Sequence, residues 1–345
     1  MSRNTPGIKT DIDLSSYNTL GVSAVASRFI DVTSKKQLTI LQKNGFFDDQ
    51  TPFILGGGSN ILFLDDPSQP IIKVSIKGKK ILEEISDSVK VEIGAGENWH
   101  EFVTWAVKNN FGGIENLALI PGTVGAAPIQ NIGAYGVELE QVFDSLELFD
   151  MRDGTFKTFE KRDCRFGYRD SVFKQELKGK VIVTSVTLNL TQSNHIIEDS
   201  YSSLQSYLKG KDIEKPIIRD IYDAVIDIRT SKLPDPKLIG NAGSFFKNPV
   251  IDNNQFERLQ SRYNEMPFYK LNDDEVKIPA AWLIEKTGWK GKRIGDVGTY
   301  KNQALVIVNH GNATGSEIFS FSKKIQQSVL RKFGIELVPE VNVVE

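Results

Sequence analysis

Two glycine-rich stretches in the first half of the chain constrain the fold more than any other feature. The first is the run 56–60, Gly-Gly-Gly-Ser-Asn, which follows the apolar pair 54–55 and precedes a second apolar run, 61–64. Residues with little or no side chain let successive backbone N–H groups turn toward one anion, so this loop is a candidate pyrophosphate cradle. A tight turn between two strands is the alternative, because the same residues favour it.

The second stretch covers residues 112–136 and carries no charged side chain after Glu115. A solvated flexible loop would contain more Ser, Asp and Lys. Pro121 and Pro128 exclude a membrane helix. This composition is typical of a buried loop whose backbone a large planar ligand can approach. Two such loops in one half of the chain favour a long ligand with a phosphate part and an aromatic part, and FAD fits that description.

Two common nucleotide-binding motifs are excluded. A Rossmann fingerprint starting at Gly56 would need glycine or alanine at position 61, which is Ile61, and an amphipathic helix directly after it. The run 288–293 lacks the spacing and the hydroxyl residue of a phosphate-binding P-loop. Any nucleotide site therefore belongs to another kind of fold.

Composition narrows the class of protein. The length of 345 residues suggests two or three domains. The 42 basic and 44 acidic residues nearly balance, so we expect no nucleic-acid partner and no membrane partner. The single cysteine, Cys164, excludes a disulfide framework, and three histidines without metal-ligand spacing predict no metal site. The N-terminal segment shows no secretory signal, so we expect a cytosolic protein.

Local signals predict a mixed order of helices and strands. Capping boxes at Ser34 and Thr314, and a cap at Asn98, predict that helices begin there, the last of them ending at Gly334. Apolar spacing predicts a helix over 221–229, broken by a polar, proline-containing junction. This order favours the α+β class over regular βαβ alternation. We expect strands at 54–55, 61–64, 89–93, 145–149, 181–188, 304–308 and 335–344.

Motifs along nearly the whole chain resemble those of one family in the family's order. The chain resembles the UDP-N-acetylenolpyruvoylglucosamine reductases, flavoenzymes that make UDP-N-acetylmuramate for peptidoglycan. The matching stretches are 18–21, 54–62, 94–100, 115–139, 164–171, 229–236, 240–249, 301–305 and 339–341.

The resemblance implies an FAD-binding part of the vanillyl-alcohol-oxidase (PCMH) type, made of two subdomains at 1–80 and 81–233. A C-terminal α+β substrate domain follows at 234–345. Neither glycine-rich loop offers a histidine or cysteine for covalent attachment, so we expect non-covalent FAD, with NADPH as the hydride donor. The resemblance assigns FAD binding to Gly56, Gly57, Gly58, Ser59, Asn60, Pro121, Gly122, Thr123, Gly125, Ala126 and Gly133.

By the same resemblance, Arg169, Ser244 and Glu340 are the catalytic residues. Arg169, in Tyr-Arg-Asp-Ser, would grip the substrate carboxylate, although an ion pair with Asp170 is the ordinary interpretation. Ser244, in Gly-Ser-Phe-Phe-Lys-Asn-Pro, would donate a proton, although outside the family it would be a plain loop serine. Glu340 follows Pro339 in a predicted C-terminal strand, where an acid is costly unless it is paired.

The resemblance also implies contacts with the UDP-sugar substrate, and we expect the protein to be a monomer. Rival interpretations are another flavin oxidase or dehydrogenase of the same fold, and a flavin-free sugar-nucleotide-binding protein. The histidines have no acidic or cysteine neighbours that suggest a metal or catalytic role. The expected substrate-binding residues are Tyr168, Tyr201, Lys232, Asn248 and Gln303.

Overall fold

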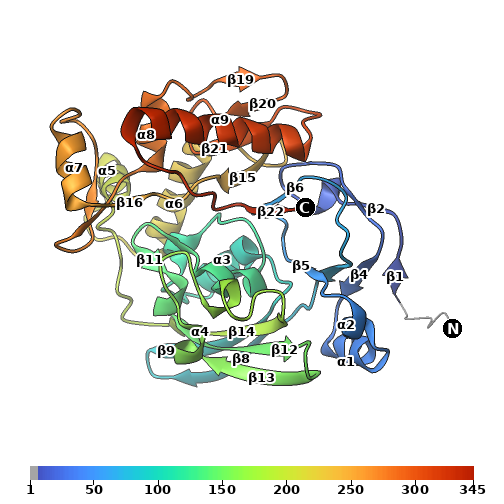
Figure 1. Ribbon diagram of the computed structural model, residues 1–345. Coiled ribbons are helices and arrows are strands. Elements are labelled where there is room, and N and C mark those ends of the chain that lie inside the picture. The colour runs from blue at the N-terminus through green and yellow to red at the C-terminus, as the bar shows by residue number, and fades with distance from the viewer. Residues whose placement is uncertain (1–6) are drawn as a thin grey trace. The chain divides into compact units, whose positions relative to one another are not determined.

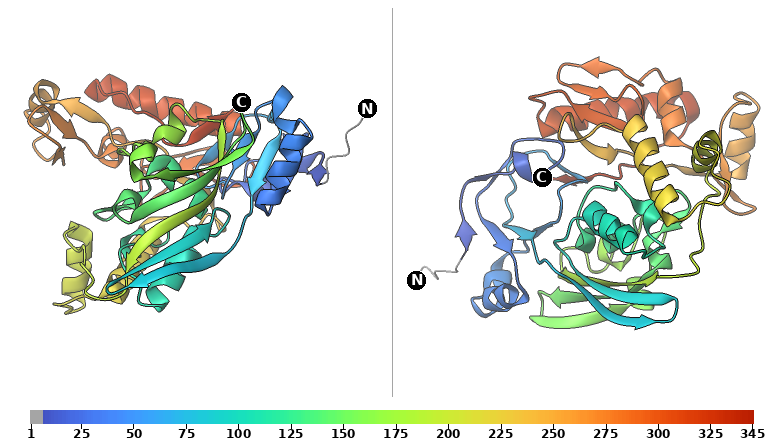
Figure 2. Two further views of the ribbon diagram at one scale, coloured as in Figure 1. Left: turned by 90° about the horizontal axis from the view of Figure 1, so that it is seen from below. Right: turned by 180° about the vertical axis from the view of Figure 1, so that it is seen from behind.

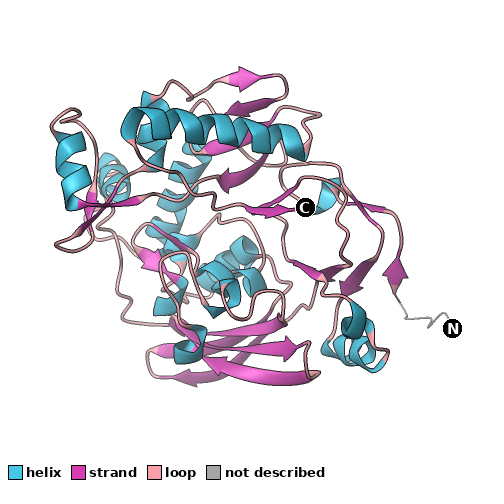
Figure 3. Ribbon diagram, viewed as in Figure 1, coloured by secondary structure: helices cyan, strands magenta, loops and turns pink. Residues whose placement is uncertain are grey.

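The computed structural model describes residues 7–345, and the chain divides into two compact units. One unit contains the segments 26–57 and 68–229 together with the residues before Asp13, and the other contains 13–25, 58–67 and 230–345. Both units mix helices and strands (Figure 3), which confirms the predicted α+β class. Residues 1–6, part of the N-terminal segment examined for a secretory signal, lie outside the described residues.

The first unit is built on an antiparallel sheet with the strand order β13-β12-β14-β9-β8 (Figures 1 and 2). In β9 the residues Val89, Val91 and Ile93 alternate with more exposed ones, so the strand presents one apolar face to the core. The strands of this sheet are β8 (Lys79–Ile85), β9 (Ser88–Gly94), β12 (Phe143–Asp150), β13 (Thr155–Glu160) and β14 (Val181–Thr191).

A smaller sheet of the same unit has the order β1-β4-β7-β5, and β7 pairs in parallel with both β4 and β5. The remaining short strands form ribbons. These elements are β1 (Ile8–Lys9), β2 (Ile12–Asp13), β3 (Val25–Ala26), β4 (Phe29–Val32), β5 (Phe53–Leu55), β7 (Ile71–Val74), β10 (Gly133–Ala134) and β11 (Val137–Glu138).

The helix α3 (Trp99–Lys108) supplies part of the first unit's core. Its cap is the predicted one, because the Asn98 side chain accepts a hydrogen bond from the Glu101 backbone N–H at 2.9 Å. Trp99 and Phe102 are buried on one face. The other helices that lie wholly in this unit are α1 (Lys35–Lys43), α2 (Phe46–Asp49), α4 (Lys161–Cys164) and α5 (Ser202–Gly210). The short 3-10 helices here are η2 (Glu115–Leu117), η3 (Val124–Ala126), η4 (Pro128–Gln130), η5 (Leu139–Gln141) and η6 (Val172–Lys174).

The second unit packs α9 (Gly315–Phe333) along a sheet with the order β15-β21-β20-β19 (Figure 1). The predicted capping box at Thr314 and Glu317 is present, and Gly334 ends the helix in a left-handed conformation. The other elements are η1 (Ser15–Tyr17), β6 (Ile61–Phe63), β15 (Gly240–Ser244), β16 (Val250–Asp252), α7 (Asn253–Gln260), β17 (Tyr269–Lys270), β18 (Glu275–Lys277), α8 (Ala280–Lys286), β19 (Arg293–Ile294), β20 (Val297–Thr299), β21 (Val306–Asn309) and β22 (Asn342–Val344).

Several predicted boundaries differ from the structure, most of them by one to three residues, and two differences bear on the site. The helix α6 (Ile218–Lys232) continues past Arg229. The first proline after it is Pro234, which disfavours helical geometry at residue 233, so the helix can extend through Lys232. The C-terminal tail is not one strand, because only β22 pairs as a strand, in parallel with β6. Glu340 therefore precedes the last strand rather than lying in it.

Candidate active site

The two glycine-rich stretches meet backbone to backbone in the first unit. A Cβ atom placed on Gly57 would lie 2.7 Å from the Cα of Gly122, and one placed on Gly56 would lie 2.9 Å from the Thr123 Oγ1. Real Cβ atoms do not approach so closely. The glycines are therefore required for the two loops to touch, and this contact of bare backbone between predicted FAD residues is the candidate cradle.

The second stretch is buried or half-buried except at Pro121 and Gly136, and it is hydrogen-bonded to the turn before α3. The Val124 N–H donates to the Glu97 carbonyl at 2.9 Å, and the Gly125 N–H donates to the Ala95 carbonyl at 2.8 Å. The Trp99 N–H donates to the Gly122 carbonyl at 3.1 Å. Backbone bonds thus fix residues 122–125, which include much of the predicted cofactor segment.

The rest of the first glycine loop belongs to the second unit, because the boundary between the units falls after Gly57. The Thr19 N–H donates to the Gly58 carbonyl at 3.0 Å. The Asn60 side-chain amide donates to the Glu340 carbonyl at 3.2 Å, and the Asn60 carbonyl accepts from the Asn342 N–H at 3.0 Å. This part of the loop therefore lies against the predicted catalytic acid.

Arg169 lies on a tight turn of the first unit. Backbone hydrogen bonds of 3.1 Å join Gly167 and Asp170 in both directions, and Arg169 between them has a left-handed φ of 53°. Its Nη2 donates to the Gly133 carbonyl at 2.5 Å, and its guanidinium lies 5.5 Å from the centre of the Tyr168 ring. The predicted carboxylate-binding residue thus contacts the end of the predicted cofactor segment.

Ser244 and Glu340 are brought together within the second unit. The register of β15 against β21 shifts between Asn241 and Ser244, and Gly243 in this bulge has a left-handed φ of 69°. A bulge re-aims the side chains that follow it, and Ser244 is exposed here. The Glu340 N–H donates to the carbonyl of Phe245 at 2.8 Å, so the tail runs directly beside the serine.

The expected substrate residues lie on several elements. Lys232 is the exposed last residue of α6, and Tyr201 precedes α5 with its ring edge-on to Tyr135 at 5.3 Å. The Asn248 side-chain oxygen accepts the Ala280 N–H at 2.9 Å, at the start of α8. The Gln303 side-chain oxygen accepts the Leu305 N–H at 3.3 Å.

Arg229 is a candidate that the sequence motifs alone did not single out. Burial lowers the pKa of Arg229, and a hydrogen bond to the Tyr135 hydroxyl opposes that shift. Its Nε has no hydrogen-bond partner among the described residues. A buried donor without a protein partner fits an acceptor-rich ligand such as the isoalloxazine of FAD. The signal was present, because Arg229 begins one of the matching stretches.

Neither a reactive thiol nor a metal site is indicated by the described residues. Burial raises the pKa of the Cys164 thiol to about 12, which argues against a reactive thiolate at neutral pH. Among residues 7–345, no group of three or more His, Cys, Asp or Glu side chains could hold a metal ion. Within the same range, no helix combines the length and the apolar character that crossing a membrane requires.

Comparison with known proteins agrees with this cofactor assignment. Residues 48–160 match the model of an FAD-binding domain, which spans the contact between the two glycine-rich stretches. Together with the bare-backbone cradle and the buried arginine, this match defines the class of protein. The chain is an FAD-dependent oxidoreductase.

Residues 235–344 match the C-terminal domain of UDP-N-acetylenolpyruvoylglucosamine reductase. The reductase of Flavobacterium johnsoniae is 49% identical over 338 residues, which cover 98% of this chain and 99% of that protein. The reductase of Pseudomonas aeruginosa is 44% identical over 96% of this chain and 97% of its own. The crystal structure of the Thermus caldophilus reductase has the same fold, with a TM-score of 0.67, 23% identity, and coverage of 98% of this chain and 100% of that one.

The chain belongs to the UDP-N-acetylenolpyruvoylglucosamine reductase family, and its function is that family's FAD-dependent reduction in peptidoglycan precursor synthesis. The resemblance inferred from the motifs is thereby confirmed. Neither rival, an oxidase of the same fold or a flavin-free binding protein, fits a family match over the full chain.

Proposed function

We propose that Arg169, Ser244 and Glu340 together reduce the enolpyruvyl ether of UDP-N-acetyl-3-O-(1-carboxyvinyl)-glucosamine to UDP-N-acetylmuramate. The single observation that supports this proposal is the backbone hydrogen bond of 2.8 Å from the Glu340 N–H to the carbonyl of Phe245, the residue after Ser244. Bound FAD would accept a hydride from NADPH and deliver it to C3 of the enolpyruvyl group.

The three residues have complementary roles. Negative charge develops on the substrate carboxylate and on C2, and a preorganised guanidinium lowers the cost of that charge. Arg169 would bind the carboxylate through paired N–H donors, and Glu340 is proposed as the catalytic acid of the group. Ser244 donates its hydroxyl proton to C2, which a weak acid can do because the carbon there is strongly basic.

The remaining predicted residues hold the ligands. Gly56 and Gly57 with the segment 121–126 would hold FAD. Lys232 supplies positive charge to the diphosphate. Because the side-chain oxygens of Asn248 and Gln303 accept backbone N–H groups, both residues would meet the substrate with their amide nitrogens, which suits a diphosphate acceptor. The other proposed ligand residues are Gly58, Ser59, Asn60, Gly133, Tyr168 and Tyr201.

Family membership supports a wider proposal. NADPH and the sugar nucleotide use the same site in turn, since the sequence shows no separate NADPH motif. The protein works as a monomer in the cytosol. Its parts are the two FAD-binding subdomains, 1–80 and 81–233, and the substrate domain, 234–345.

Replacement of Ser244 by alanine separates the two halves of the reaction. We expect Ser244→Ala to leave NADPH-dependent flavin reduction nearly unchanged and to slow substrate reduction by about 100- to 10,000-fold. Stopped-flow absorbance measures each half separately. Ser316→Ala, at an exposed serine on α9, is the matched control and should change neither half. An equal loss of both halves would mean that Ser244 supports the fold or the flavin and is not the proton donor.

A further inference from the structure

The N-terminal end of α3 runs along the predicted cofactor segment. The Trp99 indole N–H donates to the Leu117 carbonyl at 2.9 Å, and the Trp99 backbone N–H donates to the Gly122 carbonyl at 3.1 Å. Between these two contacts, the Nδ1 of His100 accepts the Leu119 N–H at 3.1 Å. Of these three contacts, only the one made by the His100 imidazole can change with pH.

The residue that His100 holds has an unfavourable backbone conformation. Leu119 has a left-handed φ of 56°, which a leucine adopts only when its surroundings impose it. It stands two residues before Pro121, the first predicted FAD residue of the segment. The hydrogen bond from its N–H to the imidazole is one of the contacts that impose this conformation.

We propose that His100 is a positioning residue for the cofactor: its imidazole accepts the Leu119 N–H and keeps residues 119–122 in the conformation that receives FAD. This inference rests on the proposed placement of FAD against 121–126. Because Nδ1 accepts, the ring proton is on Nε2. A second proton on Nδ1 would set an N–H against the Leu119 N–H and break the contact.

The imidazole ring is held from α6 as well as from its own helix. It stacks on Tyr222, with 6.1 Å between ring centres and 14° between planes. The Tyr222 hydroxyl is 2.7 Å from the Thr104 Oγ1, which in turn donates to the His100 carbonyl at 2.8 Å. These contacts fix the plane in which Nδ1 faces Leu119.

Burial favours the neutral form of His100. Burial is the main cause that lowers the pKa of His100, Glu101 on its own helix opposes it, and Arg229 on α6 lowers the pKa to a smaller extent. The Arg219 guanidinium lies 5.4 Å from the centre of the Tyr222 ring, on which the imidazole stacks. A histidine whose folded pKa lies below its ordinary value stays neutral at pH 7, and its contribution is lost only as the pH falls below about 6.5.

Two substitutions of His100 separate the effect of its hydrogen-bond acceptor from the effect of its aromatic ring. His100→Phe keeps a ring against Tyr222 but has no acceptor, whereas His100→Asn places an amide oxygen near Nδ1 and has no ring. The measurement is the rate at which FAD leaves the diluted holoenzyme, followed by the fluorescence of free FAD from pH 5 to 8. We expect His100→Phe to release FAD about 5 to 30 times faster at pH 7.5, and His100→Asn to release it within about threefold of the unmodified rate.

The pH profile distinguishes positioning from plain packing. Release from the unmodified protein should accelerate below pH 6.5, and both variants should have a flatter profile. His310→Asn, at an exposed histidine, is the matched control and should keep the original profile. Hydrogen exchange at the Leu119 amide gives a second measurement without turnover, and it should be faster in His100→Phe but not in His100→Asn.

Each outcome has a defined meaning. If His100→Phe fails to fold, the pH profile of the unmodified protein and the behaviour of His100→Asn still decide. Release from His100→Asn as fast as from His100→Phe would overturn the inference, because the ring and not the acceptor would matter. Unchanged release from His100→Phe together with rapid release from Gly57→Ala would overturn this inference alone. Unchanged release from both His100→Phe and Gly57→Ala would also overturn the proposed placement of FAD against residues 121–126.

Discussion

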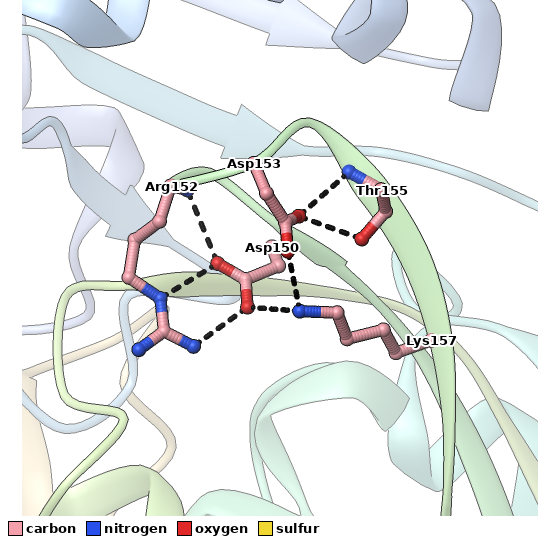
Figure 4. A network of polar contacts seen from close by, with 5 residues as sticks. All are labelled: Asp150, Arg152, Asp153, Thr155 and Lys157. Carbon is pink, nitrogen blue, oxygen red and sulfur yellow. Dashed lines mark hydrogen bonds and ion pairs between the residues drawn. The ribbon is translucent and has the colours of Figure 1, made fainter.

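Two regions of the first unit are held in different ways. The segment 116–137 has no charged side chain of its own and is fixed mainly by backbone hydrogen bonds, with side-chain contacts from Trp99, His100 and Arg169. The turn between β12 and β13 is held by ionised side chains (Figure 4). There the Asp150 carboxylate accepts hydrogen bonds from the backbone N–H and the guanidinium of Arg152. It also accepts one from the Lys157 ammonium at 2.7 Å, and that ammonium donates to the Asp153 carboxylate as well.

The two regions differ because one must keep its backbone accessible to a ligand and the other need not. The turn at Asp150 serves the fold alone, so it can satisfy its own polar groups with charged neighbours. A segment that receives a large ligand must keep its backbone accessible, and charged side chains would cover it or compete with the ligand. The segment is therefore sensitive to added volume, whereas the turn is sensitive to lost charge.

The largest expected effect comes from adding one methyl group to the cradle. In Gly57→Ala the new Cβ would lie 2.7 Å from the Gly122 Cα, and backbone has no rotamer by which to move away. We expect FAD affinity to fall about 100-fold, near the upper end of overpacking costs of roughly 3 kcal/mol. Titration of the protein with FAD, followed by flavin fluorescence, measures it.

Gly210→Ala is the matched control for that change. Gly210 ends α5, and a Cβ there would meet no atom within 4 Å. Alanine is the better helix former, so this variant should keep its FAD and gain up to about 1 kcal/mol of stability. Equal FAD affinity in the two variants would contradict the claim that the cradle is limited by space.

Asp150→Asn tests the turn between β12 and β13, which is held by ionised side chains. The side chain is 2% exposed, and the bonds from Arg152, with those from Lys157, hold the pKa of Asp150 well below its ordinary value. Such a carboxylate stabilises the fold above pH 4 and loses that contribution as the pH falls. We expect Asp150→Asn to lower the free energy of unfolding by about 2 kcal/mol at pH 7, less at pH 3, and to leave FAD affinity unchanged.

Urea unfolding at the two pH values provides the measurement for Asp150→Asn. A deficit that is the same at pH 3 and pH 7 would show that the shape of the residue matters more than its charge. A large loss of FAD affinity would show that the two regions are coupled, which would contradict the contrast between them.

The smallest effect belongs to Lys157→Met, which keeps the aliphatic stem and removes the charge. The Lys157 side chain is 39% exposed, so solvent and salt screen its bonds to Asp150 and Asp153. We expect a loss of about 0.5–1 kcal/mol in the free energy of unfolding, and a smaller loss in 1 M salt. A loss as large as that of Asp150→Asn would mean that Lys157, rather than Arg152, is the main partner.

Local capping signals in the sequence predicted where two helices begin. The caps at Asn98 and Thr314 formed where they were expected, because a capping side chain interacts within its own first turn. The partial burial of the stretch 112–136 was also predictable, since a solvated loop of that length would carry more charged side chains.

Features that depend on distant residues could not be predicted in this way. The pairing of β6 with β22, and the hydrogen bond that sets Glu340 beside Phe245, join positions hundreds or nearly one hundred residues apart. The contact between His100 and Leu119 was missed for a related reason. A histidine on an amphipathic helix carries no local mark of the backbone group that its ring will accept.

The most direct test of the account is an anaerobic titration of the purified protein, followed through the visible absorption band of the flavin. The account predicts that the protein carries FAD, that NADPH bleaches the band, and that the enolpyruvyl UDP-sugar then restores it. A colourless protein that FAD does not reconstitute would contradict the central claim, and so would a bleached flavin that oxygen reoxidises but the sugar nucleotide does not.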